Sequence, residues 1–272
     1  MAKTLMRWHG LLFRQALTIT SRVMIVRDNL RDALARKHGA AEHEMRVVRL
    51  TIDSAPNVLD AVYVEPANAA TALLLCHGIG ETVEHWMGVQ QMLAENGVAT
   101  LVFDYSGYGK STGAIEWDQL ERDAVAAFEA MRNLAPQLPA SVLGFSLGSG
   151  VAAAALSRIP AESLILCEAF TSFRAAARAA GVPKVFASLV PPIWNAEDSL
   201  RGCALPVLIV HGERDRLFPV SMARELAGIC GARGELVVVP GVAHNQPFRR
   251  PEVGYWGPIA RWLGRGQARL SG

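Results

Sequence analysis

From residue 44 onward, short stretches in which nearly every side chain is apolar alternate with stretches of helical periodicity. The apolar stretches are Thr71–Cys76, Val98–Asp104, Ala140–Phe145, Ser163–Glu168, Pro206–His211 and Glu235–Val239. A strand can be apolar throughout only if both of its faces are buried, as in a parallel sheet with helices on both sides. Helical patterns lie between most of these stretches, at Val83–Asn96, Trp117–Leu134, Leu147–Arg158, Ser221–Cys230 and Glu252–Leu263. The pattern predicts a doubly wound, mostly parallel α/β domain.

Two segments fall outside this repeating pattern. Met45–Asp53 and Val58–Glu65 read as a pair of opening strands joined by a turn. Before them, residues 1–43 carry apolar side chains three to four positions apart with arginines among them, which predicts an amphipathic helical extension. Three roles are open for this extension: a helix packed on the domain of residues 44–268, an acyl-chain gate or membrane-surface helix, or a partner interface.

Composition narrows the function classes. A chain of 272 residues with 51% hydrophobic side chains can bury one large core, and 27 basic against 25 acidic residues give no basic surface for nucleic acid. The four cysteines are far apart and have no histidines at metal-ligand spacing, so we expect no metal site. No apolar run is long enough to span a bilayer and no signal-peptide core is present, so we expect a cytoplasmic protein.

The strongest chemical signal is a Gly-x-Ser-x-Gly sequence centred on Ser146. It lies where a predicted strand ends and a predicted helix begins. In such a turn the serine takes a strained backbone conformation, and the glycines on either side let the strand and the helix pass close to it. Ser146 is therefore the candidate nucleophile.

A serine hydroxyl needs a base, usually a histidine oriented by a buried carboxylate. Asp215 follows the apolar stretch Pro206–His211, and His244 lies in the loop after Glu235–Val239. The carboxyl ends of parallel strands meet at one edge of the sheet, so we expect both side chains near Ser146. Glu168 is an alternative acid because it ends its own strand, and we interpret His211 as a packing or hydrogen-bonded histidine.

Acyl transfer also needs donors for a negative oxygen. The loop after Thr71–Cys76 contains His77 and Gly78, and we expect the amides of Ile79 and Leu147 to form the oxyanion hole. His77 and Gly78 are also candidates for lining the substrate site, with His77 shaping the loop rather than acting as a second base. The Gly-x-Gly at residues 107–109 lacks the spacing of a nucleotide-binding motif and is interpreted as a structural turn.

An apolar insertion at about residues 171–204 separates the sixth and seventh predicted strands. It is rich in alanine and proline and predicts a short helical lid. Its aromatic side chains either pack within the lid or face an acyl substrate. The candidate substrate contacts are Phe173, Phe186 and Trp194.

Taken together, these motifs resemble the α/β-hydrolase superfamily over Glu44–Leu263. The likeness rests on His77-Gly78, the turn at residues 104–109, the sequence around Ser146, the turn at residues 212–215, and His244-Asn245. Within that superfamily the sequence looks most like small-lid serine hydrolases, which include palmitoyl-protein thioesterases and bacterial carboxylesterases. Ala243 stands where that branch usually has glycine, and residues 1–43 contain no cysteine for the lipid anchoring of some thioesterases.

The resemblance and the motifs predict a serine hydrolase acting on small or medium acyl esters. Two-step hydrolysis by a serine requires no cofactor, so we expect none. A thioesterase, an amidase or an acyltransferase would use the same three side chains. A non-catalytic binding protein of the same fold is the alternative from another class. The sequence does not indicate an oligomeric state.

Overall fold

A computed structural model describes residues 45–252 and 254–270, so the predicted helical extension of residues 1–43 lies outside the described residues. The strands are β1 (Met45–Ser54), β2 (Asn57–Pro66), β3 (Thr71–Cys76), β4 (Val98–Phe103), β5 (Ala140–Phe145), β6 (Leu164–Cys167), β7 (Val207–Gly212) and β8 (Gly234–Val239). The α-helices are α3 (Val83–Ala94), α4 (Trp117–Leu134), α5 (Leu147–Ala155), α6 (Phe173–Ala179), α7 (Ala196–Arg201), α8 (Val220–Cys230), α9 (Gln246–Arg249) and α10 (Trp256–Leu270). Short 3₁₀ helices are η1 (Leu156–Arg158), η2 (Lys184–Leu189) and η3 (Gly231–Arg233).

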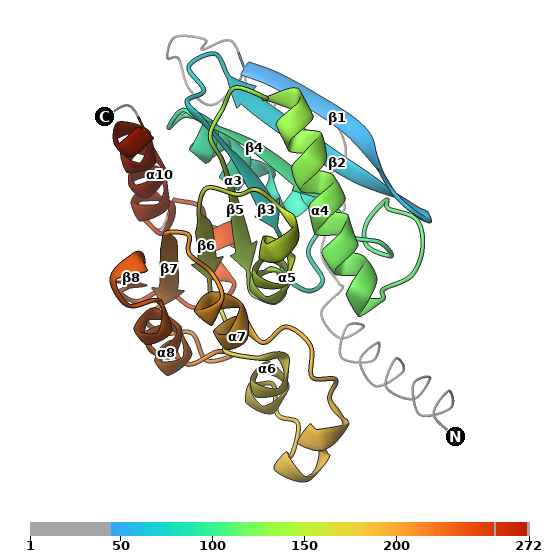
Figure 1. Cartoon of the computed structure of the whole chain (residues 1–272), viewed down its shortest axis with the longest axis vertical. Helices are drawn as coiled ribbons and strands as arrows, with labels where there is room; N and C mark the ends of the chain where they lie inside the picture. The colour runs from blue at the N-terminus through green and yellow to red at the C-terminus, as the bar shows by residue number, and fades with distance from the viewer. Residues whose placement is uncertain (1–44, 253, 271–272) are drawn as a thin grey trace. The chain divides into compact units, whose positions relative to one another are not determined.

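The eight strands form one sheet in the order β1-β2-β4-β3-β5-β6-β7-β8 (Figure 1). β1 pairs with β2 and β2 with β4 in antiparallel register, and every other neighbouring pair is parallel. The predicted doubly wound, mostly parallel sheet is confirmed. From β3 the chain adds β4 on one side and β5 to β8 on the other, so the strand order reverses at β3. Sheets of this kind bind ligands at such a reversal, beside the carboxyl ends of the strands, which here are those of β3 and β5.

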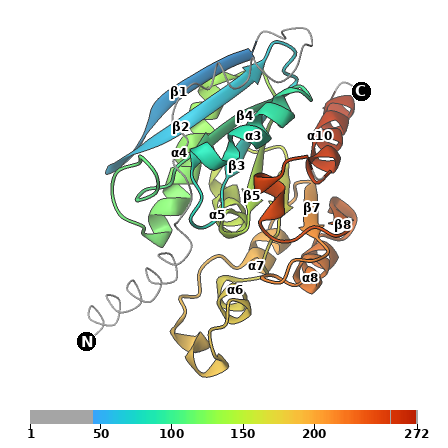
Figure 2. The same cartoon turned by 180° about the vertical axis from the view of Figure 1, so that it is seen from behind.

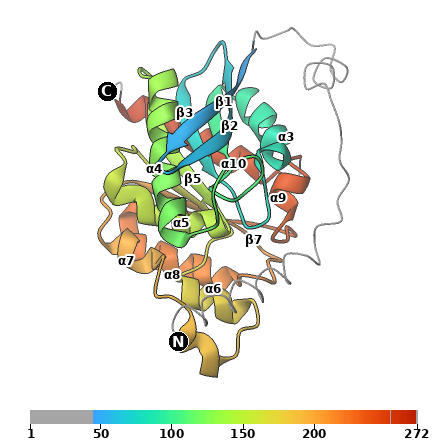
Figure 3. The ribbon, with the colours of Figure 1, turned by 90° about the vertical axis from the view of Figure 1, so that its right-hand side faces the viewer.

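Helices cover both faces of the sheet, which explains why its central strands are apolar at every position. Along β3, Leu74 belongs to the hydrophobic cluster shared with α4, α5 and α8, whereas Leu73 belongs to the cluster shared with α3 and α10. Figure 2 shows α3 and α10 on the side opposite to the view of Figure 1, and Figure 3 shows the sheet between the two helical layers. Because side chains alternate along a strand, each central strand contributes to both clusters.

The C-terminal helix begins later than predicted. The sequence pattern places a helix from Glu252, but α10 begins at Trp256. Gly254 has a φ of 78°, which lies in the left-handed region and cannot continue a right-handed helix. The short helix α9, which the sequence pattern does not predict, fills part of the segment between β8 and α10.

Between β6 and β7 the chain forms α6, η2 and α7, within the predicted lid region (Figure 1). An antiparallel bridge between Ser172 and Asn195 joins the two ends of this segment. The apolar side chains of Val185, Phe186 and Leu189 on η2 are exposed. Among the described residues, no helix combines the length and apolar character needed to cross a membrane.

Candidate active site

Three side chains predicted from separate segments form one hydrogen-bonded chain. His244 Nε2 lies 2.9 Å from Ser146 Oγ, and His244 Nδ1 lies 2.7 Å from Asp215 Oδ2. Since Asp215 can only accept when ionised, Nδ1 carries hydrogen and Nε2 is free to accept from the serine hydroxyl. Phe145 and Phe218 pack against the imidazole ring with centroid separations of 5.7 Å and 5.1 Å. The imidazole is therefore held by two aromatic contacts as well as by hydrogen bonds at both nitrogens.

The backbone of Ser146 holds the hydroxyl at the end of β5. Its φ of 51° is rare for a residue with a side chain and costs about 1–3 kcal/mol, which the surrounding structure must offset. Cβ atoms added at Gly144 and Gly148 would collide with the backbone of Gly148 and of Cys76, respectively. Only glycine permits the strand and helix α5 to approach so closely on either side of the serine.

Asp215 lies in the turn after β7 and is buried. Its Oδ1 accepts the amides of Leu217 and Phe218 at 2.8 Å and 2.9 Å. Burial acts to raise its pKa, but hydrogen bonds from His211 and His244 outweigh that effect and hold the pKa of Asp215 well below the ordinary range. The group is therefore a carboxylate at neutral pH, able to stabilise an imidazolium at His244.

The two alternative residues of the sequence analysis lie beside this carboxylate. His211 Nε2 lies 2.8 Å from the carbonyl oxygen of Phe218 and 3.3 Å from Asp215 Oδ2, as expected for a hydrogen-bonded packing histidine. Glu168 is completely buried at the end of β6, and its Oε1 accepts the amide of Gly212 at 2.7 Å. Glu168 therefore lies close to the hydrogen-bonded chain of Ser146, His244 and Asp215, in which His244 makes its short bond to Asp215.

The predicted oxyanion donors lie on the loops after β3 and β5. His77 Nδ1 donates to the carbonyl oxygen of Gly78 at 2.8 Å, and the Tyr105 hydroxyl donates to the carbonyl oxygen of His77 at 3.2 Å. In a trans peptide the C=O and N–H point in opposite directions, so the bond to Gly78 also fixes the direction of the Ile79 amide. The Leu147 amide lies at the first position of α5, where an N–H has no acceptor within the helix.

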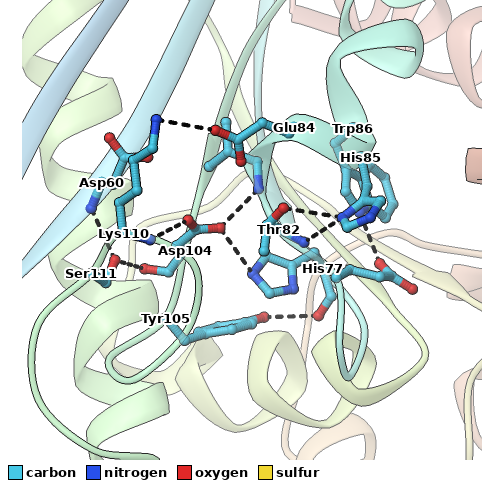
Figure 4. Close-up of polar contacts among 12 residues, drawn as sticks. Asp60, His77, Thr82, Glu84, His85, Trp86, Asp104, Tyr105, Lys110 and Ser111 are labelled. Atoms are coloured by element: carbon cyan, nitrogen blue, oxygen red, sulfur yellow. Dashed lines mark hydrogen bonds and ion pairs between the residues drawn. The ribbon is translucent and has the colours of Figure 1, made fainter. Parts of the chain in front are cut away.

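His77 is neutral and serves this loop rather than a reaction. Burial lowers its pKa to about 4, against a partial opposing effect of its bond to Gly78. Its Nε2 lies 3.9 Å from Asp104 Oδ1, a contact marked in Figure 4 that is too long for a hydrogen bond. With its Nδ1 committed to a backbone carbonyl, His77 shapes the loop.

Asp104 joins that loop to the glycine turn that follows β4 (Figure 4). Its Oδ1 accepts the amide of Val83 at the start of α3 at 2.8 Å, and its Oδ2 accepts the amide of Lys110 at 3.1 Å. A Cβ at Gly109 would overlap the Asp104 carboxylate. The Gly-x-Gly sequence thus forms a structural turn beside the loop that follows β3.

Glu81 was not predicted from the sequence, yet it is buried directly beneath Gly78. Its Oε2 accepts both the Gly78 amide and Trp86 Nε1 at 2.8 Å. Burial raises the pKa of Glu81 to about 7, although the two hydrogen bonds act to lower it. The signal in the sequence is an acid placed directly after the loop glycines, in a segment that is otherwise poor in charge.

The lid residues lie in two different environments. Phe173 and Trp194 are buried and form an aromatic cluster with Trp117, at centroid separations of 5.1–5.4 Å. Phe186 is 53% exposed on η2. Among the described residues, the aromatic rings in contact with His244 are instead Phe145 and Phe218, neither of which was predicted as a site residue.

Comparison with known proteins identifies similar chains of three kinds. An uncharacterized protein of Mycobacterium tuberculosis is 30% identical over 65% of this chain and 63% of its own length. The lysophosphatidylserine lipase ABHD12 of Xenopus tropicalis is 26% identical over 66% of this chain and 55% of its own. The chain thus spans less than two thirds of these curated relatives. An esterase of Pyrococcus furiosus has a similar fold, with a TM-score of 0.68 and 20% identity over 89% of this chain and 98% of its own.

A family model supplies the assignment. The model described as serine aminopeptidase, S33, matches residues 67–203, which include β3 to β6, Ser146 and the lid. That range is half of the chain, and it carries the strand-turn-helix in which the serine lies. The chain therefore belongs to the serine aminopeptidase S33 family of α/β hydrolases.

Proposed function

We propose that this protein is a serine hydrolase that cleaves carboxylic esters through an acyl-Ser146 intermediate. The observation that carries the proposal is the continuous hydrogen-bonded chain from Ser146 through His244 to Asp215. A protein that only binds ligands has no need of a base aligned on a strained serine. The names of its relatives, a lysophosphatidylserine lipase and an esterase, support ester cleavage.

In the first step Ser146 Oγ attacks the ester carbonyl carbon while His244 Nε2 takes the hydroxyl proton. The resulting imidazolium is stabilised by Asp215, and it then gives the proton to the leaving alkoxide as the C–O bond of the ester breaks. In the second step His244 takes a proton from water, and the hydroxide attacks the acyl carbon. The acid departs when His244 returns a proton to Ser146 Oγ. Protons balance over the cycle, which consumes one water.

Each attack converts the carbonyl oxygen into an oxyanion, for which the amides of Ile79 and Leu147 are the proposed donors. Support comes from their positions just after the carboxyl ends of adjacent strands, because the register pairs Cys76 of β3 with Gly144 of β5. The Leu147 amide also benefits from the positive end of the α5 dipole. Loss of one such donor typically costs about 10²–10³-fold in kcat.

Covalent labelling tests whether Ser146 is a nucleophile. A fluorophosphonate probe should label the wild-type chain and leave Ser146→Ala unlabelled, because only an activated serine oxygen displaces fluoride from phosphorus. Ser149→Ala is a matched control, since the Ser149 hydroxyl donates to the Ser146 carbonyl oxygen rather than to His244. A folded wild-type chain that resists labelling would leave a non-catalytic binding protein as the function.

A substrate panel tests the ester assignment. Acyl esters of graded chain length, a lysophospholipid, acyl thioesters and aminoacyl anilides should be compared by kcat/KM. The family description names an aminopeptidase, so an amidase is the second candidate, and higher kcat/KM for anilides than for esters would favour it. Release of thiol faster than alcohol at equal chain length would instead assign a thioesterase.

A further inference from the structure

Two carboxyl groups converge on His244 from neighbouring strands. Glu168 follows β6 and Asp215 follows β7, and these two strands are parallel neighbours in the sheet. One oxygen of each carboxyl group and one nitrogen of His244 all lie within 4.8 Å of one another. The proposed mechanism uses Asp215 and His244 and leaves Glu168 without a role.

Both carboxyl groups cannot be ionised together at this spacing. Two buried like charges raise the free energy of the doubly ionised state, so one group holds a proton. Within the described residues, no lysine or arginine pairs with either group, and the ion-pair partners of Glu168 and Asp215 are His211 and His244. The question is which carboxyl group keeps the proton.

The hydrogen-bond donors assign the negative charge to Asp215. That carboxylate accepts three hydrogen bonds, from the amides of Leu217 and Phe218 and from His244 Nδ1, and His211 Nε2 lies 3.3 Å from its Oδ2. Glu168 accepts one, from the amide of Gly212 to Oε1. Donors stabilise an ionised oxygen, so the proton resides on Glu168.

The remaining oxygen of Glu168 is the one that can carry this proton. Oε2 is buried and has no hydrogen-bond partner, and it lies 3.6 Å from His211 Nε2. The nearby Tyr255 hydroxyl donates to the Val210 carbonyl oxygen at 2.8 Å, so its own proton is committed. An unpaired buried oxygen is costly, and a proton directed at the Asp215 carboxylate removes that cost.

The backbone of Glu168 has the same kind of strain as that of Ser146, a positive φ angle. Its φ of 47° lies in the left-handed region, which among the described non-glycine residues is shared by Ser146 and Trp194 alone. Such strain persists where the surrounding structure requires a side chain at one place, and it gathers at functional sites. A glutamate held there without a cation is difficult to explain by packing.

We propose that Glu168 is a protonated positioning residue, whose carboxylic acid directs its proton to the Asp215 carboxylate and so fixes the group that orients His244. The role presupposes the proposed triad. Glu168 touches neither the serine nor the substrate and acts through Asp215. In agreement, burial first, the hydrogen bond to Asp215 second and the Asp215 charge third raise the pKa of Glu168 to about 9.

Infrared spectroscopy tests the protonation without any substrate. The C=O stretch of a carboxylic acid is separate from the bands of a carboxylate, so the difference between wild type and Glu168→Gln isolates one group. The measurement belongs at about pH 8, between the pKa values of about 7 for Glu81 and about 9 for Glu168. We expect an acid band that Glu168→Gln removes and that the control Glu162→Gln, at an exposed carboxylate, retains. If Glu168→Gln loses no acid band relative to the wild type, the proposal is wrong, whether or not the protein is active.

Kinetics with two variants test the positioning. Glutamine keeps a neutral shape and an N–H donor in place of the acid proton, so Glu168→Gln should retain kcat within about threefold. Glu168→Ala should lower kcat about tenfold or more with little change in KM, because a charge-assisted hydrogen bond to Asp215 is lost. Circular dichroism should establish that both variants are folded. Equal losses of kcat in the two variants would mean that Glu168 acts as a carboxylate, against the proposal.

Discussion

Replacing Glu81 by glutamine should remove a pH dependence of folding stability. Both hydrogen bonds to this side chain end on one oxygen, Oε2, which accepts the Gly78 amide and Trp86 Nε1. A glutamine carbonyl can accept both, so the substitution changes the charge and leaves the contacts. Few buried carboxyl groups allow the titration to be separated so cleanly from the hydrogen bonding.

The magnitude follows from the elevated pKa. Burial raises the pKa of Glu81 from 4.5 to about 7, which corresponds to about 3 kcal/mol between the protonated and ionised forms. Between these two values the unfolded chain has released the proton and the native chain retains it. The free energy of unfolding therefore falls by up to about 3 kcal/mol as the pH rises from 4.5 to about 7. Above about pH 7, Glu81 causes no further loss of stability.

Urea denaturation at a series of pH values measures the effect. The free energy of unfolding of the wild type minus that of Glu81→Gln should decline from about pH 4.5 to about pH 7. Subtraction cancels the titration of every other group. Glu84→Gln is a matched control of opposite sign. Burial acts to raise the pKa of Glu84, but its hydrogen bonds and the charges of Arg49 and Lys110 together lower that pKa to about 2. Parallel curves for wild type and Glu81→Gln would refute the assignment of a raised pKa to Glu81.

Three further changes should have distinct effects. Gly148→Ala drives a methyl group into the Cys76 carbonyl, so it should displace α5 and abolish fluorophosphonate labelling, and labelling at the wild-type rate would contradict this. Trp86→Ala removes a completely buried ring and should lower the free energy of unfolding by about 3–5 kcal/mol in urea, whereas a loss under about 1 kcal/mol would be inconsistent with that burial. Asp215→Ala should reduce kcat by about 10⁴-fold in steady-state assays. A greater loss of kcat in Glu168→Ala would mean that Glu168, and not Asp215, is the carboxylate that orients His244.

Much of the fold could be predicted because burial on both faces of a strand leaves an unbroken apolar run. Thr71–Cys76 and Ala140–Phe145 have in the structure the bounds that their hydrophobicity predicts, and so does helix Trp117–Leu134. Ser146, Asp215 and His244 could be proposed for a related reason, since each follows such a run. Parallel strands bring those positions to one edge without any knowledge of distances.

Other features depend on contacts between segments that no local pattern encodes. Glu81 supports the loop after β3 through a side chain that accepts a hydrogen bond from the Gly78 amide, and its neighbours in sequence do not reveal that contact. The lid illustrates a second limit, because apolar letters alone do not separate the buried Trp194 from the exposed Phe186. Helix α10 begins late because the backbone of Gly254 turns left-handed, a property of conformation rather than of hydrophobic pattern.

Ser146 and His244, the proposed nucleophile and base, are separated by 98 positions along the chain. Ser146 follows β5, but His244 follows β8, which pairs only with β7 at the sheet edge among the described strands. During synthesis Ser146 is therefore added to the chain well before His244. Under the proposed mechanism, a chain whose β8 has not yet paired with β7 lacks the base that Ser146 needs, so ester cleavage is expected only once the last strand of the described sheet is in place.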